Sequence, residues 1–190
     1  MTKSILISGV GGQGALLAST VLGKLLLTAG YDVKISEVHG MAQRGGSVVT
    51  HVRYGEKVYS PLIEACSADT LLSFEKLESL RWIDLLKAGG RVISNTQTIR
   101  PAGMTKPQDK YPDDIEDRLN KGGYQTQWID GQQLALQAGN IKAVNTVMLG
   151  VLSKHLELSV EEWDAAIAAS VPAKLLEINR KAFLLGREAS

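Results

Sequence analysis

The sequence predicts a three-layer α/β fold with a mostly parallel sheet. Short apolar segments typical of buried strands alternate with longer segments of helical periodicity along most of the 190 residues. This order favours parallel strands joined by right-handed helical crossovers. The first junction between a strand and a helix, at residues 9–14, also has the glycine spacing G-x-G-x-x-G that such folds use to turn from strand into helix. We therefore expect a Rossmann-like sheet.

The N-terminal part of the chain predicts one interruption of the parallel order. Apolar residues 4–8 predict a buried strand, and the helical pattern that follows ends at a glycine, which is common at helix C-termini. Alternation of apolar and polar residues predicts strands at 32–37 and 47–54. The turn at Gly55-Glu56 then leads into residues 57–59, which indicates a β-hairpin insertion.

The rest of the chain returns to the strand–helix alternation and ends in helices. Pro172 suits the first turn of the last helix, because a helix needs no backbone donor there. We expect residues 1–158 to form one Rossmann-like domain and residues 159–190 to form a C-terminal helical extension packed on the same domain. Further strands are predicted at 69–74, 91–95 and 124–129, and helices at 14–29, 77–86, 113–121, 132–138, 142–155, 160–169 and 172–186.

Composition excludes several classes of protein. Hydrophobic residues make up 44% of the chain and charged residues 22%, which is ordinary for a globular domain. A net charge of +1 argues against nucleic-acid binding, which needs a basic excess. No apolar run approaches the ~20 residues of a membrane span, and the N-terminus lacks the pattern of a signal peptide. We expect a cytoplasmic protein with no nucleic-acid or membrane partner.

Cysteine and histidine usage limits the metal chemistry that this chain can perform. Cys66 is the single cysteine, so the chain alone cannot form an internal disulfide, ligate a conventional iron–sulfur cluster or build a thiolate zinc site. The three histidines are far apart in the sequence, without the spacing of metal ligands. We expect no metal site in this chain.

The glycine-rich segment at residues 9–14 predicts a site for an anionic group. Glycine allows a tight turn and a close approach of a ligand, and the following helix N-terminus offers unpaired N–H groups. Glu37, at the end of the second predicted strand, occupies the place where an acid would bind the ribose of a dinucleotide. The alternatives are another anionic cofactor, or a turn that only lets the helix pack closely on the sheet.

The segment at residues 38–46 points away from a dinucleotide. A typical unit of that kind continues into a second helix, whereas this chain has a glycine-rich loop with His39, Gln43 and Arg44. The loop follows a strand and should lie beside the first glycine loop, at the edge of the sheet where α/β proteins place their ligands. Its composition indicates a binding or docking surface, with an ordinary solvated loop as the alternative.

Three segments together resemble the γ-type domain of the 2-oxoacid:ferredoxin oxidoreductases. They are residues 9–14 (GVGGQG), 37–48 (EVHGMAQRGGSV) and 145–150 (NTVMLG). The resemblance covers nearly the whole chain and is strongest to the small subunits of the indolepyruvate enzymes. It implies a Rossmann-like subunit of an enzyme that oxidatively decarboxylates aryl pyruvates such as indolepyruvate, with coenzyme A as co-substrate and ferredoxin as electron acceptor.

The resemblance also implies a division of labour between two chains. Thiamine diphosphate, Mg and 4Fe–4S clusters are expected on a large (α) subunit, so this chain is expected to bind none of them alone and to be inactive without its partner. Ferredoxin would meet the assembled complex, and the isolated chain could form a homodimer. The candidate residues at the cofactor, the substrate or the subunit interface are Gly11, Gly12, Gln13, Gly14, Glu37, His39, Gln43, Arg44 and Asn145. None of them is assigned as catalytic.

Several alternatives stay open. Asn145 could contact a ligand or bond to the glycine loop, and His39 could simply satisfy its own loop. The substrate could instead be pyruvate, 2-oxoglutarate or a branched oxoacid. The chain could also be a free-standing NAD(P)- or flavin-binding protein with Glu37 on the ribose, or an interaction module without enzymatic function.

Overall fold

The computed structural model describes residues 2–40, 45–101, 103–106 and 108–189 of the chain. A six-stranded sheet forms its centre, in the order β2-β3-β1-β4-β5-β6. The strands are β1 (Lys3–Val10), β2 (Asp32–His39), β3 (Ser47–Gly55), β4 (Ala68–Ser73), β5 (Leu86–Asn95) and β6 (Gln125–Ile129). The helices are α1 (Ala15–Thr28), α2 (Lys76–Arg81), α3 (Ile115–Lys121), α4 (Gly131–Ala138), α5 (Val144–Ser153), α6 (Val160–Ala168) and α7 (Leu176–Glu188), with short 3-10 turns at Ile83–Leu85, Ile141–Ala143 and Ala173–Leu175.

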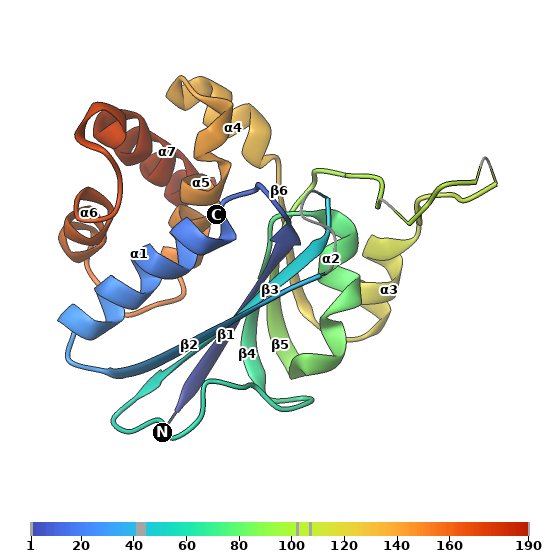
Figure 1. Ribbon diagram of the computed structural model, residues 1–190, viewed down its shortest axis with the longest axis horizontal. Helices are drawn as coiled ribbons and strands as arrows, with labels where there is room; N and C mark the ends of the chain where they lie inside the picture. Colours follow the sequence, from blue (N-terminus) through green and yellow to red (C-terminus); the bar gives the residue numbers. More distant parts are fainter. Residues whose placement is uncertain (1, 41–44, 102, 107, 190) are drawn as a thin grey trace.

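The sheet confirms the predicted fold class. Strands β1, β4, β5 and β6 are parallel, while β3 runs antiparallel to both of its neighbours, β1 and β2. Helices α1 and α4 to α7 cover one face and α2 and α3 the other, which gives three layers (Figure 1). Each face has its own apolar cluster, the larger one under α1, α5, α6 and α7 and the smaller one under α2 and α3.

The antiparallel hairpin is present, but its strands differ from those predicted. Strand β3 pairs with β2 on one side, and residues 57–59, predicted as a strand, form none. The amide of Val58 donates to the Asp32 carboxylate at 2.9 Å instead of to a neighbouring strand. The Gly55-Glu56 turn is a local signal, and it was outweighed by the pairing of β3 with β2 along the whole length of β2.

Helices α5 and α7 cross unusually closely through two glycines. A Cβ added at Gly186 would overlap the carbonyl oxygen of Val147 and lie 2.8 Å from its carbon. A Cβ added at Gly150 would overlap the carbonyl oxygen of Phe183 and lie 2.9 Å from the Arg187 nitrogen. Residues of α6 and α7 belong to the same apolar cluster as residues of α1 and α5. The boundary at residue 158 stays a prediction.

None of the helices in the described part of the chain is long and apolar enough to cross a membrane.

Candidate functional site at the carboxyl edge of the sheet

The glycine loop turns the chain from β1 into α1 at the carboxyl edge of the parallel strands (Figure 1). Gly12 and Gly14 have φ values of 100° and 84°, which only glycine adopts without strain, and Gly14 is the N-cap of α1. The amide of Gly11 donates to the carbonyl of Gly46 at 2.9 Å. Residues 11–14 and the returning arm of the 38–46 loop therefore lie side by side, as the sequence predicts.

The side chain of Gln13 forms three hydrogen bonds at this edge of the sheet. Its Oε1 accepts the amide of Val10 at 2.7 Å, and its Nε2 donates to the Phe74 carbonyl and to Gln97 Oε1, both at 2.9 Å. Both amide hydrogens are thus used within the chain. Gln13 shapes the loop and links the ends of β1, β4 and β5.

Asn145 contacts the same loop from α5. Its Nδ2 donates to the Gly14 carbonyl at 3.3 Å, and a Cβ at Gly14 would lie 2.6 Å from that nitrogen. Asn145 Oδ1 accepts the amide of Thr146, and the residue is only 3% exposed. Of the two roles that the sequence allows, this geometry favours the bond to the glycine loop.

A pocket of about 370 Å³ opens beside the glycine loop. It lies between Gly12–Gly14, the end of β5 and the start of α5. Among the described residues, no acceptor bonds the amides of Gly12 and Gly14, and Lys142 is the cationic residue that lines the pocket. Unpaired backbone donors at a helix N-terminus, together with a cation, favour a phosphate or carboxylate. The lining residues are Gly12, Gln13, Gly14, Gln97, Gln132, Ile141, Lys142 and Val144.

Sequence reasoning missed three polar residues of this pocket. Gln97 follows the predicted strand at 91–95, so its place just beyond a carboxyl end was a usable signal. Gln132 and Lys142 begin helical segments more than 115 residues after the glycine loop. Nothing local in the sequence indicates that these two residues face it.

Glu37 and His39 form a pair at the end of β2. His39 Nε2 lies 2.7 Å from Glu37 Oε1, and Thr50 on β3 donates to Glu37 Oε2 at 2.9 Å. Strand β3 separates β2 from β1, so Glu37 lies two strand spacings, roughly 9–10 Å, from the strand that leads into the glycine loop. In a dinucleotide fold the ribose-binding acid follows a strand adjacent to the first. Both the displacement and the occupied carboxylate argue against the dinucleotide alternative.

Gln43 and Arg44 lie outside the described residues. The arms that flank them are held together, since the Gly40 amide donates to the Ser47 carbonyl at 2.8 Å. A buried carboxylate anchors the returning arm from α2: Glu78 accepts the Ser47 hydroxyl, accepts Trp82 Nε1 at 3.2 Å and pairs with Arg81 at 3.0 Å. Desolvation raises the pKa of Glu78, and the bonds from Ser47 and Arg81 only partly oppose it.

Glu78→Gln should make the protein relatively more stable as the pH rises. A carboxyl group whose pKa is raised in the folded state stabilises the fold below its unfolded pKa of about 4.5, and this contribution is lost as the pH rises through the folded value. The amide keeps an acceptor for Ser47 and has no charge to desolvate. Unfolding in urea between pH 4 and pH 7 should show the variant gaining free energy of unfolding relative to the wild type.

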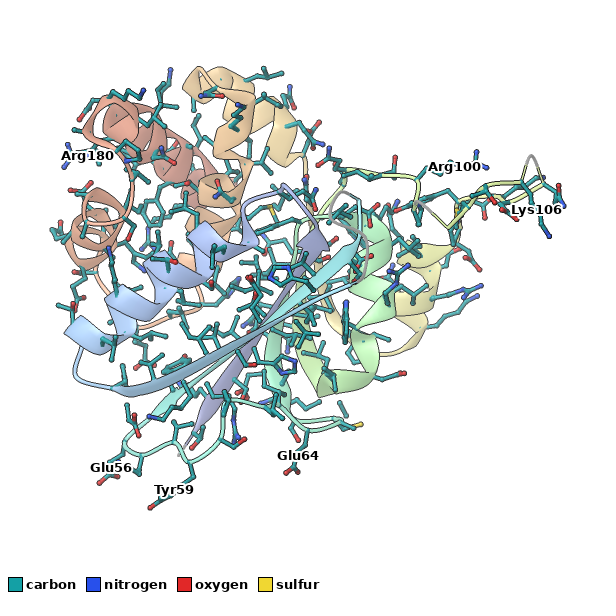
Figure 2. All side chains as sticks on the ribbon, in the orientation of Figure 1. Glu56, Tyr59, Glu64, Arg100, Lys106 and Arg180 are labelled. Atoms are coloured by element: carbon teal, nitrogen blue, oxygen red, sulfur yellow. The ribbon has the colours of Figure 1, made fainter. Side chains whose placement is uncertain are left out.

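The control for this measurement is Glu64→Gln, because Glu64 lies at the opposite end of the molecule and points away from it (Figure 2). If the difference between Glu78→Gln and the wild type stays constant with pH, or follows the control, the desolvation of Glu78 is not the dominant cause.

Within the described ranges, no group of three or more His, Cys, Asp or Glu side chains could hold a metal ion. Cys66 is exposed and lies in a turn with a φ of 55°.

Comparison with known proteins assigns the chain to a family. The model of the family described as pyruvate ferredoxin/flavodoxin oxidoreductase matches residues 4–189. The chain belongs to this family. It is 42% identical to the indolepyruvate oxidoreductase subunit IorB of Thermococcus kodakarensis, over 98% of this chain and 95% of that relative. It is 31% identical to the 2-oxoglutarate synthase subunit KorC of Methanothermobacter marburgensis, over 99% of this chain and 96% of that relative.

Solved structures of the family have the same fold. The γ subunit of a keto/oxoacid ferredoxin oxidoreductase from Geobacter sulfurreducens superposes with a TM-score of 0.75 at 25% identity, covering 98% of this chain and 97% of that one. The expected family resemblance is therefore confirmed, and the chain is an oxidoreductase subunit of the γ type.

Proposed function

We propose that this chain is the small subunit of a 2-oxoacid:ferredoxin oxidoreductase that converts aryl pyruvates such as indolepyruvate to aryl-acetyl-CoA and CO2. One observation carries the choice of substrate: identity is 42% to a subunit named for indolepyruvate and 31% to one named for 2-oxoglutarate, at nearly equal coverage. The corresponding subunit of a pyruvate, 2-oxoglutarate or branched-chain oxoacid enzyme is the second candidate.

The redox cofactors belong to the large subunit in this proposal. A 4Fe–4S cluster needs four ligands, usually cysteines, and the chain has one cysteine, so its residues do not fit a cluster. Nor do the described residues gather the carboxylates that would hold Mg, and we place thiamine diphosphate and its Mg with the partner. The chain would thus complete an active site whose thiamine diphosphate and iron–sulfur clusters are held by the large subunit.

In this proposal coenzyme A binds at the pocket beside the glycine loop. Lys142 and the free amides of Gly12 and Gly14 are suited to one of its phosphate groups, and the apolar rim of Ile141 and Val144 to its less polar parts. The contribution of this chain is then to bind and orient the co-substrate at the subunit boundary.

Reconstitution tests the proposal directly. The chain alone should neither bind NADH tightly nor turn over indolepyruvate. Co-expressed with its large subunit under anoxic conditions, it should give coenzyme A-dependent reduction of a viologen dye, fastest with aryl pyruvates. Tight NADH binding by the isolated chain would overturn the assignment, and faster turnover of 2-oxoglutarate or pyruvate would favour the second candidate.

Lys142→Gln in the reconstituted complex should raise the KM for coenzyme A by about fivefold, which corresponds to the ~1 kcal/mol of one exposed ion pair. The KM for the oxoacid should stay unchanged. Lys121→Gln, on α3 at the other face of the sheet, is the matched control. An unchanged KM for coenzyme A in Lys142→Gln would remove this pocket as the phosphate site.

A further inference from the structure

The pair formed by Glu37 and His39 has the architecture of a proton-transfer group. Thr50 is fully buried and holds one Glu37 oxygen, while the other Glu37 oxygen holds His39 Nε2. The Glu37 side chain is 16% exposed and that of His39 63% exposed. A fixed carboxylate therefore orients an accessible imidazole whose Nδ1 has no hydrogen bond among the described residues.

The imidazole stands at the same edge of the sheet as the glycine loop. In the strand register His39 lies opposite Val48, and Val48 lies opposite Gly9. The arm that returns from this loop brings the carbonyl of Gly46 to the glycine loop, where it accepts the amide of Gly11.

The packing of β2 against α1 agrees with this placement of His39. Ile35, Glu37 and His39 share one face of β2, because side chains alternate along a strand. Ile35 contacts α1 at Gly23, whose added Cβ would lie 2.8 Å from Ile35 Cδ1. His39 lies four residues after Ile35 along the strand, a distance of ~13 Å. The same distance along α1 is about nine residues toward its N-terminus from Gly23, so His39 is level with the first turn of α1.

Stability alone gives little reason for this arrangement. An ion pair with an exposed partner contributes at most about 1 kcal/mol, and β2 is an edge strand on which a solvated residue would serve equally well. A histidine held at one nitrogen by a carboxylate keeps a fixed tautomer and leaves its second nitrogen as a proton acceptor, which is the usual construction of a general base.

We propose that His39 is the general base for the thiol of coenzyme A in the assembled enzyme, with Glu37 and Thr50 as its positioning residues. This inference rests on the proposed function. The S–H bond of the coenzyme breaks, the proton passes to His39 Nδ1, and the electron pair stays on sulfur as the thiolate nucleophile. The thiolate would then form the C–S bond of the thioester while the acyl carbon is released from its carrier on the partner subunit, the two electrons of the oxidation having passed to ferredoxin as in the proposed function. His39 finally releases the proton to solvent. Thiols have an ordinary pKa near 8.5, so few are ionised at neutral pH without a base.

The test separates the coenzyme-dependent step from the steps before it. In the reconstituted complex, His39→Asn should lower coenzyme A-dependent turnover by about 10²-fold, the typical contribution of a general base. Single-turnover release of CO2 from indolepyruvate without coenzyme A should keep the wild-type rate, and the KM for coenzyme A should change little. Glu37→Gln should cause a smaller loss, and Thr50→Val a smaller one still.

Chemical rescue distinguishes a base from a structural residue. Added imidazole should restore part of the turnover of His39→Ala, because it replaces the missing proton acceptor, and it should have no effect on the wild type. His155→Asn, an exposed histidine that follows α5, is the control and should behave as the wild type.

The outcomes distinguish the two proposals. If the wild-type complex shows no coenzyme A-dependent turnover of any oxoacid, the proposed function fails and this inference fails with it. If the wild-type complex is active and His39→Asn retains its turnover, only the inference fails. A loss in His39→Asn that extends to CO2 release, or that imidazole does not relieve in His39→Ala, would also overturn it and assign His39 a structural role.

Discussion

Gly186→Ala should destabilise the protein, although alanine is the better helix former. Helix propensity favours alanine over glycine by about 1 kcal/mol at an exposed position. The new Cβ at Gly186, however, would overlap the backbone carbonyl of Val147 on α5, which cannot rotate out of the way as a side chain can. Overpacking of this kind costs about 1–3 kcal/mol and sometimes more, so we expect a net loss of roughly 2 kcal/mol, measured by urea denaturation.

Gly150→Ala should give a similar loss, because its added Cβ would overlap the backbone of α7 at the same crossing. Gly103→Ala is the control, since among the described residues nothing beyond its chain neighbours lies within 4 Å of its added Cβ. A stabilised Gly186→Ala would mean that α5 and α7 move apart at little cost. The crossing also bears on the site, because α5 carries the Asn145 that bonds to Gly14.

Gln13→Glu should disrupt the carboxyl edge of the sheet more than the change of one atom suggests. The carboxylate keeps an acceptor for the Val10 amide, but its second oxygen replaces the donor that Phe74 and Gln97 require. Three oxygens would then meet at hydrogen-bond distance, one of them charged. We expect a loss of about 2–4 kcal/mol in the free energy of unfolding at pH 7.

Two further variants calibrate this effect. Gln13→Met removes the same hydrogen bonds without adding charge and should cost less than Gln13→Glu. Gln137→Glu, exposed on α4, should be close to neutral. Equal stability of Gln13→Glu and Gln137→Glu would show that the side chain of Gln13 does not hold the loop in solution. In the complex, Gln13→Glu should also weaken coenzyme A, because it places a negative charge beside the proposed phosphate pocket.

The sequence predicted those parts of the molecule that depend on local patterns. The period-2 and period-3.6 patterns placed the parallel strands and most helices, and the glycine spacing placed the turn into α1. The pairing of the strands was harder to predict. The turn at Gly55-Glu56 predicted a hairpin with residues 57–59, whereas β3 pairs with β2 across the seven residues 40–46. Local turn propensity was outweighed there by the burial of β3 between two strands.

The candidate site was predictable only where it follows the ends of strands. Glu37, His39 and Gln97 all come at or just after a carboxyl end, so topology brings them to one edge. Lys142 reaches that edge through the packing of α5, which no local pattern encodes. The role of Gln13 was ambiguous for the opposite reason, since a glutamine beside a glycine loop can face a ligand or the protein, and only the positions of Phe74 and Gln97 decide.

The hydrogen bond from Gly11 to Gly46 should make the glycine loop and the returning arm of the 38–46 loop open together. The Gly11 amide cannot reach solvent unless the returning arm moves away, and that arm is tied in turn to Gly40 through Ser47. In hydrogen–deuterium exchange, the amides of Gly11 and Gly40 should therefore exchange at similar rates and become protected together when a ligand or the partner subunit binds either loop. Occupancy at the glycine loop would then be communicated across β3 to the loop that begins at His39.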